Sequence, residues 1–297
     1  MPRLIDTAAD DAITLDELVD ALDADPWDPR DEDAFAARGI WLARLARNRR
    51  FLADMAIAEL ETRFAGQARN SYGAQVLMLR PPGGRYALRA AFWPAHGDAV
   101  VRAAGTAPFF YDLPHDHNFS FLTVGYLGPG YWSDYYLADQ AFDGRTHRVV
   151  GDRAGLTFDR RARLEPGQVM LYRAHRDVHV QHPPDRFSVS LNILGHDRAQ
   201  PWRTQYRFDT ATDTIAQAMT VTPSEALVTI AAQLGGDDGT GLAQDIALRH
   251  PNSRMRATAL AALNGLLSPP ATHRLAERAA DDRDPCNAAA ARAILAG

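Results

Sequence analysis

The sequence predicts an α+β protein in which an antiparallel β-domain lies between two helical regions. Short strand-like runs separated by turn residues fill the middle of the chain, and capping signals with helical periodicity mark both ends. The composition changes near residues 70 and 210. We therefore expect an N-terminal helical segment over 1–70, a β-barrel over 71–210 and a repeat-like helical domain over 211–297.

The N-terminal segment carries a helix start signal and a helix break. Thr14 is followed three residues later by Glu17, which fits a capping box. The acidic, proline-containing stretch 23–29 ends that helix. A longer helical pattern, with apolar residues at mixed three- and four-residue spacing, then runs over about 31–63.

The middle of the chain consists of many short strand-like runs. The first two are joined by Pro-Pro-Gly-Gly at 81–84, a turn signal. Short strands at regular spacing, with no helices between them, are typical of antiparallel sandwiches and barrels. The runs cover 75–80, 85–93, 99–102, 117–127, 131–137, 146–150, 155–158, 168–172, 179–181, 187–194 and 204–208.

The C-terminal region is helical again from about residue 222. Thr222 and Glu225 fit a second capping box, with Pro223 at the first helical position. Two segments that begin at Pro251 and Pro285 look alike, and they resemble a pair of degenerate HEAT-like repeats. The alternative is an irregular helical cap. A repeat array with a concave face suits a peptide or protein partner.

The composition excludes several classes of function. The chain has 32 basic residues, all arginine, so P-loop, Schiff-base and kinase chemistry that depends on lysine is absent. One cysteine allows no disulfide framework within the chain. A net charge of −5 argues against nucleic-acid and membrane-surface partners. With no visible signal peptide or membrane-spanning run, we expect a cytoplasmic protein.

Seven of the ten histidines lie between residues 115 and 196, and two of them form a His-x-His element. In a strand, side chains two apart point the same way, so His115 and His117 present two imidazoles to one point while Asp116 faces away. Such a pair chelates a divalent first-row metal when a third ligand comes from elsewhere. The third candidates are His175, His179 and His182.

These residues occur in an order that resembles the two motifs of the cupin superfamily. His115-Asp116-His117 is followed by 166–172 (Pro-Gly-Gln-Val-Met-Leu-Tyr), then 179–181 and 187–193. The resemblance covers about 72–208 and implies a double-stranded β-helix barrel. By the family's spacing of eight residues on from Leu171, it implies that His179 is the third ligand.

The sequence departs from the usual cupin motifs in two places. Phe121 and Leu122 stand where the first motif usually carries a glutamate ligand, and 173–175 replaces the Pro-x-Gly of the second. The remaining three-histidine set is similar to the thiol-dioxygenase branch of the cupins, which holds Fe(II) in that way. A 2-oxoglutarate cosubstrate is not expected, because no carboxylate lies in register with the histidine pair.

Other residues near the motifs are candidates for substrate binding and catalysis. Arg89 and Arg173 are candidate anchors for an anionic group, with a solvent-facing position as the alternative for each. Tyr126 is a candidate hydroxyl in a pocket with aromatic walls, and Tyr135 and His182 are candidate catalytic groups.

Three functions are consistent with these features. The first is a non-heme Fe(II) oxygenase that uses molecular oxygen on a small organic or peptidic substrate. The second is a non-oxygenase cupin, an isomerase, lyase or hydrolase with Zn, Mn or Ni at the same ligands. The third is a non-catalytic binding or scaffold protein. Cupins often pair through sheet edges, so the resemblance also implies a homodimer.

Overall fold

The computed structural model describes residues 2–8, 10–68, 70, 72–138 and 148–296, and it consists of helices and antiparallel sheets. The predicted α+β class is therefore confirmed. Contacts divide the chain into two compact units, one formed by 1–139 and 155–200 and the other by 140–154 and 201–297. The three-part division by composition stays a prediction. Within the described ranges, no helix is long and apolar enough to cross a membrane.

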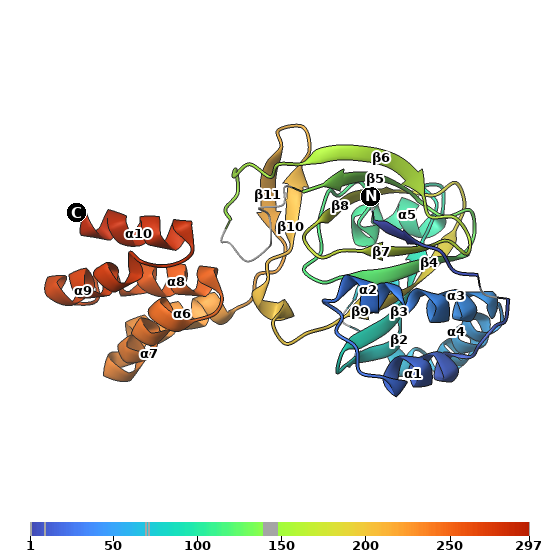
Figure 1. Cartoon of the computed structure of the whole chain (residues 1–297), viewed down its shortest axis with the longest axis horizontal. Coiled ribbons are helices and arrows are strands. Elements are labelled where there is room, and N and C mark those ends of the chain that lie inside the picture. Colours follow the sequence, from blue (N-terminus) through green and yellow to red (C-terminus); the bar gives the residue numbers. More distant parts are fainter. Residues whose placement is uncertain (1, 9, 69, 71, 139–147, 297) are drawn as a thin grey trace. The chain divides into compact units, whose positions relative to one another are not determined.

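Two antiparallel sheets build the first unit (Figure 1). The six-stranded sheet has the order β1-β7-β4-β9-β3-β2, and the three-stranded sheet has the order β6-β5-β8. The strands of the larger sheet are β1 (Arg3–Ile5), β2 (Val76–Gly83), β3 (Tyr86–Trp93), β4 (Phe121–Leu127), β7 (Val169–Tyr172) and β9 (Ser188–Gly195). Those of the smaller sheet are β5 (Trp132–Leu137), β6 (Thr157–Arg163) and β8 (Asp177–His182).

Strand alternation divides the side chains of the larger sheet between two cores. On β4, Leu122 and Val124 join a core with the N-terminal helices, whereas Phe121 joins a second core between the two sheets. Tyr135 of the smaller sheet also belongs to that second core, so the two sheets pack face to face. We call this second core, which includes the polar side chains between the sheets, the inter-sheet core.

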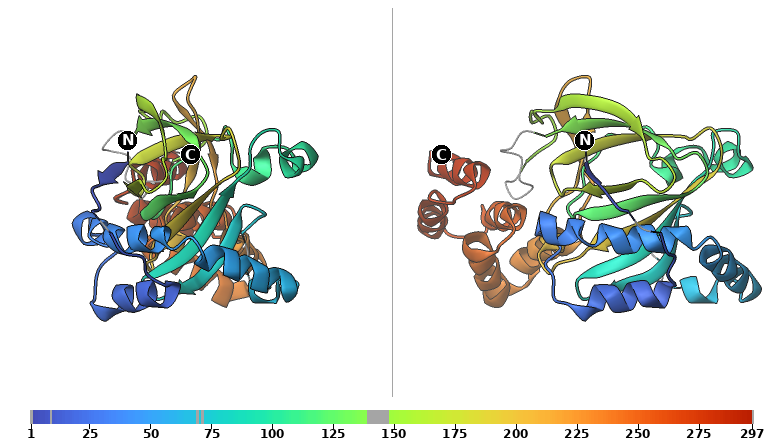
Figure 2. Two further views of the ribbon diagram at one scale, coloured as in Figure 1. Left: turned by 90° about the vertical axis from the view of Figure 1, so that its right-hand side faces the viewer. Right: turned by 45° about the vertical axis from the view of Figure 1, so that its right-hand side comes forward.

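The N-terminal helices cover the outer face of the larger sheet, and Figures 1 and 2 show them gathered on that side. The helices of this unit are α1 (Leu15–Ala24), α2 (Glu32–Ala36), α3 (Gly39–Arg47), α4 (Phe51–Glu61) and α5 (Ala99–Ala104), with short 3-10 turns η1 (Ala65–Gln67) and η2 (Ala107–Phe109). The pattern predicted over 31–63 is three helices. It breaks at Asn48, whose backbone is extended and whose Oδ1 accepts from the amides of Arg50 and Phe51.

Two of the predicted strands are not strands. Residues 99–102 lie in α5, which starts after Asp98 and ends at Gly105 with φ of +75°. A glycine with positive φ is a common helix end, and that signal was outweighed by the valines at 100 and 101. Of the run 146–150, residues 146 and 147 lie outside the described residues, and 148–150 form no strand.

The second unit combines a β-hairpin with a set of short helices. Its elements are β10 (Tyr206–Asp209), β11 (Thr214–Ala218), α6 (Ser224–Leu234), α7 (Gly236–Arg249), α8 (Ser253–Leu263), α9 (Pro269–Ala279) and α10 (Pro285–Leu295), with η3 (Gln200–Trp202) at the boundary of the units along the chain. The side chains of Asn252 and Asp284 cap α8 and α10. The Arg256–Asp282 ion pair links α8 to the turn before α10. The HEAT-like repeat stays a prediction.

The two predicted capping boxes differ in the structure. At α1 the amide of Glu17 donates to Thr14 Oγ1 at 3.2 Å, and the Thr14 amide donates to the Glu17 carboxylate at 2.8 Å, as predicted. The second prediction is wrong. Pro223 occupies the cap position of α6 without a side-chain bond, and the Thr222 hydroxyl is bonded to that of Ser224.

Replacing the two threonines by alanine should therefore have unequal effects. Thr14→Ala removes a cap and is expected to destabilise the first turn of α1 by about 1 kcal/mol. Thr222→Ala removes no bond to the helix backbone and should change the stability of the first turn of α6 by roughly a few tenths of that amount. Hydrogen–deuterium exchange of the first-turn amides measures both. Equal acceleration in the two helices would contradict the assignment.

Candidate metal centre

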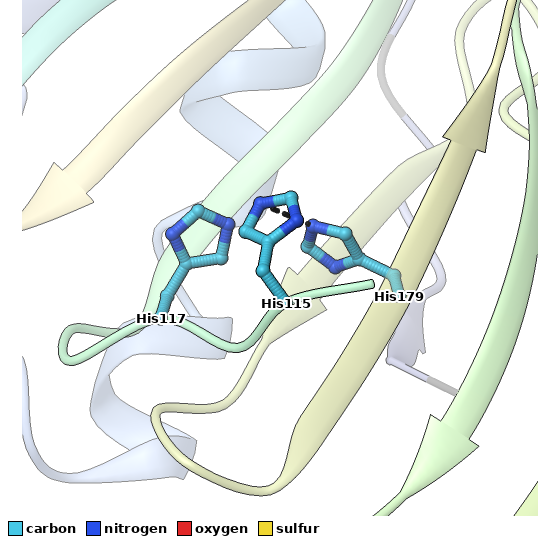
Figure 3. A group of neighbouring side chains, drawn as sticks. All are labelled: His115, His117 and His179. Carbon is cyan, nitrogen blue, oxygen red and sulfur yellow. Dashed lines mark hydrogen bonds between the residues drawn. The ribbon is translucent and has the colours of Figure 1, made fainter. Parts of the chain in front are cut away.

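The structure brings His115, His117 and His179 together in the inter-sheet core (Figure 3). His179 lies on β8, whereas the other two lie on the irregular segment before β4. The backbones of His115 and His179 form an antiparallel bridge with N–O distances of 3.1 and 3.0 Å. The His-x-His element was expected in a strand, but only His115 pairs with a neighbouring strand.

The ring nitrogens of His115 and His179 have the separation that two ligands of one metal ion require, and a nitrogen of His117 lies close to both. The His115 Nδ1–H donates to the carbonyl of Leu113 at 2.8 Å, which leaves the Nε2 lone pair free for a ligand. This Nε2 lies 3.3 Å from Nε2 of His179, and one nitrogen of each of the three rings lies within 4.8 Å of the others. Two nitrogens bound at about 2.1 Å to one ion would be separated by roughly 3.0–3.4 Å.

Burial keeps these imidazoles neutral. It lowers the pKa of His115, and it lowers the pKa of His117 and His179 well below 6.5. Repulsion from the neighbouring rings lowers the pKa of His117 and His179 further. Since a metal binds the neutral imidazole, the pocket holds its three donors in the form that binds.

This burial predicts a pH dependence for the metal-free protein. Above pH 6.5 a histidine is neutral in both folded and unfolded states and contributes nothing to the pH dependence. Below 6.5 the unfolded state takes up protons that buried His117 and His179 do not, so stability falls as the pH falls. Each of the two lowers the free energy of unfolding by about 1 kcal/mol per pH unit below 6.5. Urea unfolding between pH 8 and 5.5 measures this slope, and His117→Gln should reduce the slope to what His115 and His179 contribute.

Aromatic rings surround the histidine cluster. The Phe121 ring lies 4.8 Å from His117 and stacks on Tyr172 at 4.4 Å, and Tyr172 meets His179 edge-on at 4.9 Å. The Tyr172 hydroxyl is 3.0 Å from that of Tyr135, which is the cross-strand neighbour of His179. Burial raises the pKa of both tyrosines, so both hydroxyls stay protonated. Tyr135 is thus connected to the cluster through the ring of Tyr172.

Arg89 faces the same core. On β3 it shares a face with Ala87 and Ala91, which belong to the inter-sheet core, and its charge also lowers the pKa of His115 and His117. Its Nε is buried and has no hydrogen-bond partner among the described residues. The guanidinium lies over the Tyr72 ring at 5.3 Å, and burial lowers its pKa. An arginine stays charged in such a site, so a half-buried cation without a carboxylate partner in the described part of the chain borders the core.

Two other candidates lie away from the cluster. Tyr126 is on the opposite face of β4, where its ring packs on Phe51 and its hydroxyl donates to the Asn48 carbonyl at 2.9 Å. Arg173 is at the end of β7 and donates to both carboxylate oxygens of buried Asp177, at 2.8 and 2.6 Å. This ion pair and its hydrogen bonds raise the pKa of Arg173. The structure brings neither residue to the histidines.

The alternative third ligands have other partners. His182 lies at the end of β8, with Nδ1 2.8 Å from Asp112 Oδ1 and Nε2 3.1 Å from Asp134 Oδ2. His175 is buried, with Nδ1 2.8 Å from Asp116 Oδ2. Of the three alternatives, His179 alone joins the cluster of His115 and His117. His182, the second catalytic candidate, therefore bridges two carboxylates outside the cluster.

Several polar residues of the inter-sheet core were not among the predicted site residues. Asn192 on β9 is the cross-strand neighbour of both Arg89 and Thr123, and its Nδ2 donates to Thr123 Oγ1 at 2.7 Å. Buried Tyr131 interacts through its hydroxyl with Thr123 and Tyr172. The signal was alternation: Thr123 lies two residues after Phe121, on the face that the His-x-His element was expected to share.

The comparisons with known proteins give no family. No family model and no curated protein matches the chain. Among solved structures, it is similar to the polyketide cyclase RemF from Streptomyces resistomycificus (11% identity, 44% of this chain and 72% of that chain, TM-score 0.23). It is also similar to the DMSP lyase DddQ from Ruegeria pomeroyi DSS-3 (16%, 67% and 78%, 0.28) and to vicilin from Corylus avellana (12%, 47% and 33%, 0.23). At these TM-scores we draw neither fold nor activity from the likenesses.

Proposed function

We propose that the chain is a metal-dependent enzyme of cupin-like fold in which His115, His117 and His179 hold one divalent first-row metal ion. The supporting observation is the cluster itself, in which three histidines offer one ring nitrogen each within 4.8 Å. Their pKa values keep them neutral, and the Nδ1 bond of His115 fixes its tautomer. Such an all-nitrogen donor set suits Fe(II), Zn, Ni or Mn with positions left open for substrate.

Arg89 would bind an anionic group of a small organic or peptidic substrate beside the metal. It is a cation that faces the inter-sheet core, and its buried Nε has no acceptor among the described residues. The aromatic rings of Phe121 and Tyr172 exclude water from this side of the cluster. Tyr135 and Tyr172, both protonated, can donate a hydrogen bond or a proton toward the core.

For the reaction class we propose an oxygenase that uses Fe(II) and molecular oxygen. Bound Fe(II) supplies redox chemistry toward oxygen, and a donor set without a carboxylate leaves its charge to be balanced by an anionic substrate. The alternative is a non-oxygenase reaction in which Zn, Mn or Ni acts as a Lewis acid. The two protonated tyrosines favour this alternative, because acid catalysis by a proton donor beside a Lewis acid does not require molecular oxygen.

Metal analysis of protein purified without chelators tests the site and separates the alternatives. Wild type is expected to hold about one equivalent of metal, and His117→Ala should lose it. His182→Ala is the matched control, because it removes a histidine outside the cluster and should retain the metal. Iron together with substrate-dependent oxygen uptake supports the oxygenase. Zinc, manganese or nickel with activity under anaerobic conditions supports the alternative. A wild type that stays metal-free after Fe(II) reconstitution contradicts both.

A further inference from the structure

Asp116 stands between two of the candidate ligands, but its side chain belongs to a different contact. It is fully buried, and its Oδ2 accepts from the Nδ1–H of His175 at 2.8 Å. His175 lies in the connection between β7 and β8, the strand that carries His179. The contact therefore joins the two segments that supply the metal ligands.

The backbone reinforces this junction. The His175 amide donates to the carbonyl of His117 at 2.9 Å, and the Ala174 amide donates to Ser120 Oγ at 3.1 Å. His175 has φ of +58°, a left-handed conformation that is rare outside glycine and asparagine. A residue keeps this conformation when its surroundings fix it, here through its ring and its amide together.

His117 depends on this junction more than His115 does. The backbone bridge to His179 fixes His115 directly, whereas His117 is outside that bridge. Its carbonyl is instead bonded to His175, whose ring is held by Asp116, the residue next to His117. A change in the Asp116–His175 contact would move the His117 ring relative to the other two.

We propose that Asp116 and His175 are positioning residues that hold His117 against His115 and His179 and thereby set the affinity and geometry of metal binding. The proposal rests on the proposed function, since it requires the three histidines to bind a metal. Outer partners that orient metal ligands typically change metal affinity 10- to 100-fold when removed.

Co(II) is the probe, because its absorption spectrum reports coordination geometry independently of activity. We expect Asp116→Ala and His175→Asn to bind Co(II) about 10-fold more weakly than wild type and to show a shifted spectrum at saturation. Asparagine is chosen at 175 because it tolerates positive φ. Asp116→Asn keeps an acceptor oxygen and should restore most of the affinity and the wild-type spectrum. The double variant Asp116→Ala/His175→Asn should bind Co(II) no more weakly than the weaker-binding single variant, because the two substitutions remove the same contact.

Asp282→Asn is the matched control. It alters another ion-paired carboxylate, half-buried in the second unit, and should leave the Co(II) spectrum and affinity unchanged. If wild type fails to bind Co(II), the proposed function fails. If wild type binds and both Asp116→Ala and His175→Asn, folded by circular dichroism, match it in affinity and spectrum and are merely less stable, the role is structural and the proposal is overturned.

Discussion

Replacing Arg89 by methionine is expected to raise the free energy of unfolding of the unliganded protein by about 1 kcal/mol. The half-buried side chain places a positive charge beside the inter-sheet core, its Nε is buried without a partner among the described residues, and it also faces His115 and His117. Methionine has a similar length and no charge, so the substitution removes the desolvation penalty without opening a large cavity.

The same substitution at Arg173 should have the opposite sign. Its guanidinium donates to both oxygens of Asp177, whose carboxylate is fully buried. Arg173→Met leaves that carboxylate without its partner and is expected to lower the free energy of unfolding by about 3–5 kcal/mol. Urea unfolding of both variants beside wild type measures the pair. Destabilisation by Arg89→Met to the same extent as Arg173→Met would mean that Arg89 is held by a structural partner.

The stabilisation expected for Arg89→Met bears directly on function. A buried charge without a partner persists in a protein when a ligand supplies the partner, and removing it then gains stability at the expense of binding. Small carboxylates added to metal-loaded wild type should therefore raise its melting temperature by mass action, and they should not do so in Arg89→Met. Stabilisation of both proteins to the same extent would mean that the carboxylate binds at a site that does not involve Arg89.

Much of the β-domain and of the candidate site could be predicted from local sequence patterns. Alternation placed Arg89 on one face of its strand with Ala87 and Ala91, and the structure shows that this face lies in the inter-sheet core. The spacing of His115 and His117 set their rings on one side and Asp116 on the other. These features depend on neighbours within two or three residues, so the sequence alone contains them.

The features that sequence reasoning missed depend on contacts between distant segments. Tyr126 points to the same face of β4 as Leu122 and Val124, and this face packs against the helices. Which face of the strand packs on which core depends on the packing of both sides of the sheet. Arg173 is an exception, because its partner Asp177 is only four residues further on, across the turn between β7 and β8. His175 was an open choice for the third ligand because its bond to Asp116 joins residues 59 positions apart.

The connection between β4 and β5 restricts how the two sheets can pack, and a substitution at Gly130 tests this restriction. Gly130 has φ of +83°, and a Cβ at this position would overlap the carbonyl oxygen of Leu164. Its amide also donates to Ser188 Oγ at 3.1 Å, and the adjacent Tyr131 carbonyl accepts from the Leu164 amide at 3.1 Å. The backbone at this point therefore ties β5 to the residue that follows β6 and to the start of β9.

Gly130→Ala is expected to lower the free energy of unfolding by about 4 kcal/mol or more, because an overlap with backbone cannot be relieved by a rotamer change. Gly167→Ala is the matched control: Gly167 has φ of +78°, but a Cβ there would meet nothing within 4 Å, so about 1 kcal/mol is expected from conformation alone. β5 pairs with β8 through Tyr135 and His179, so Gly130→Ala should also weaken Co(II) binding while Gly167→Ala should not. Equal stability losses in urea unfolding would show that the turn can move away from Leu164 without disturbing the sheet.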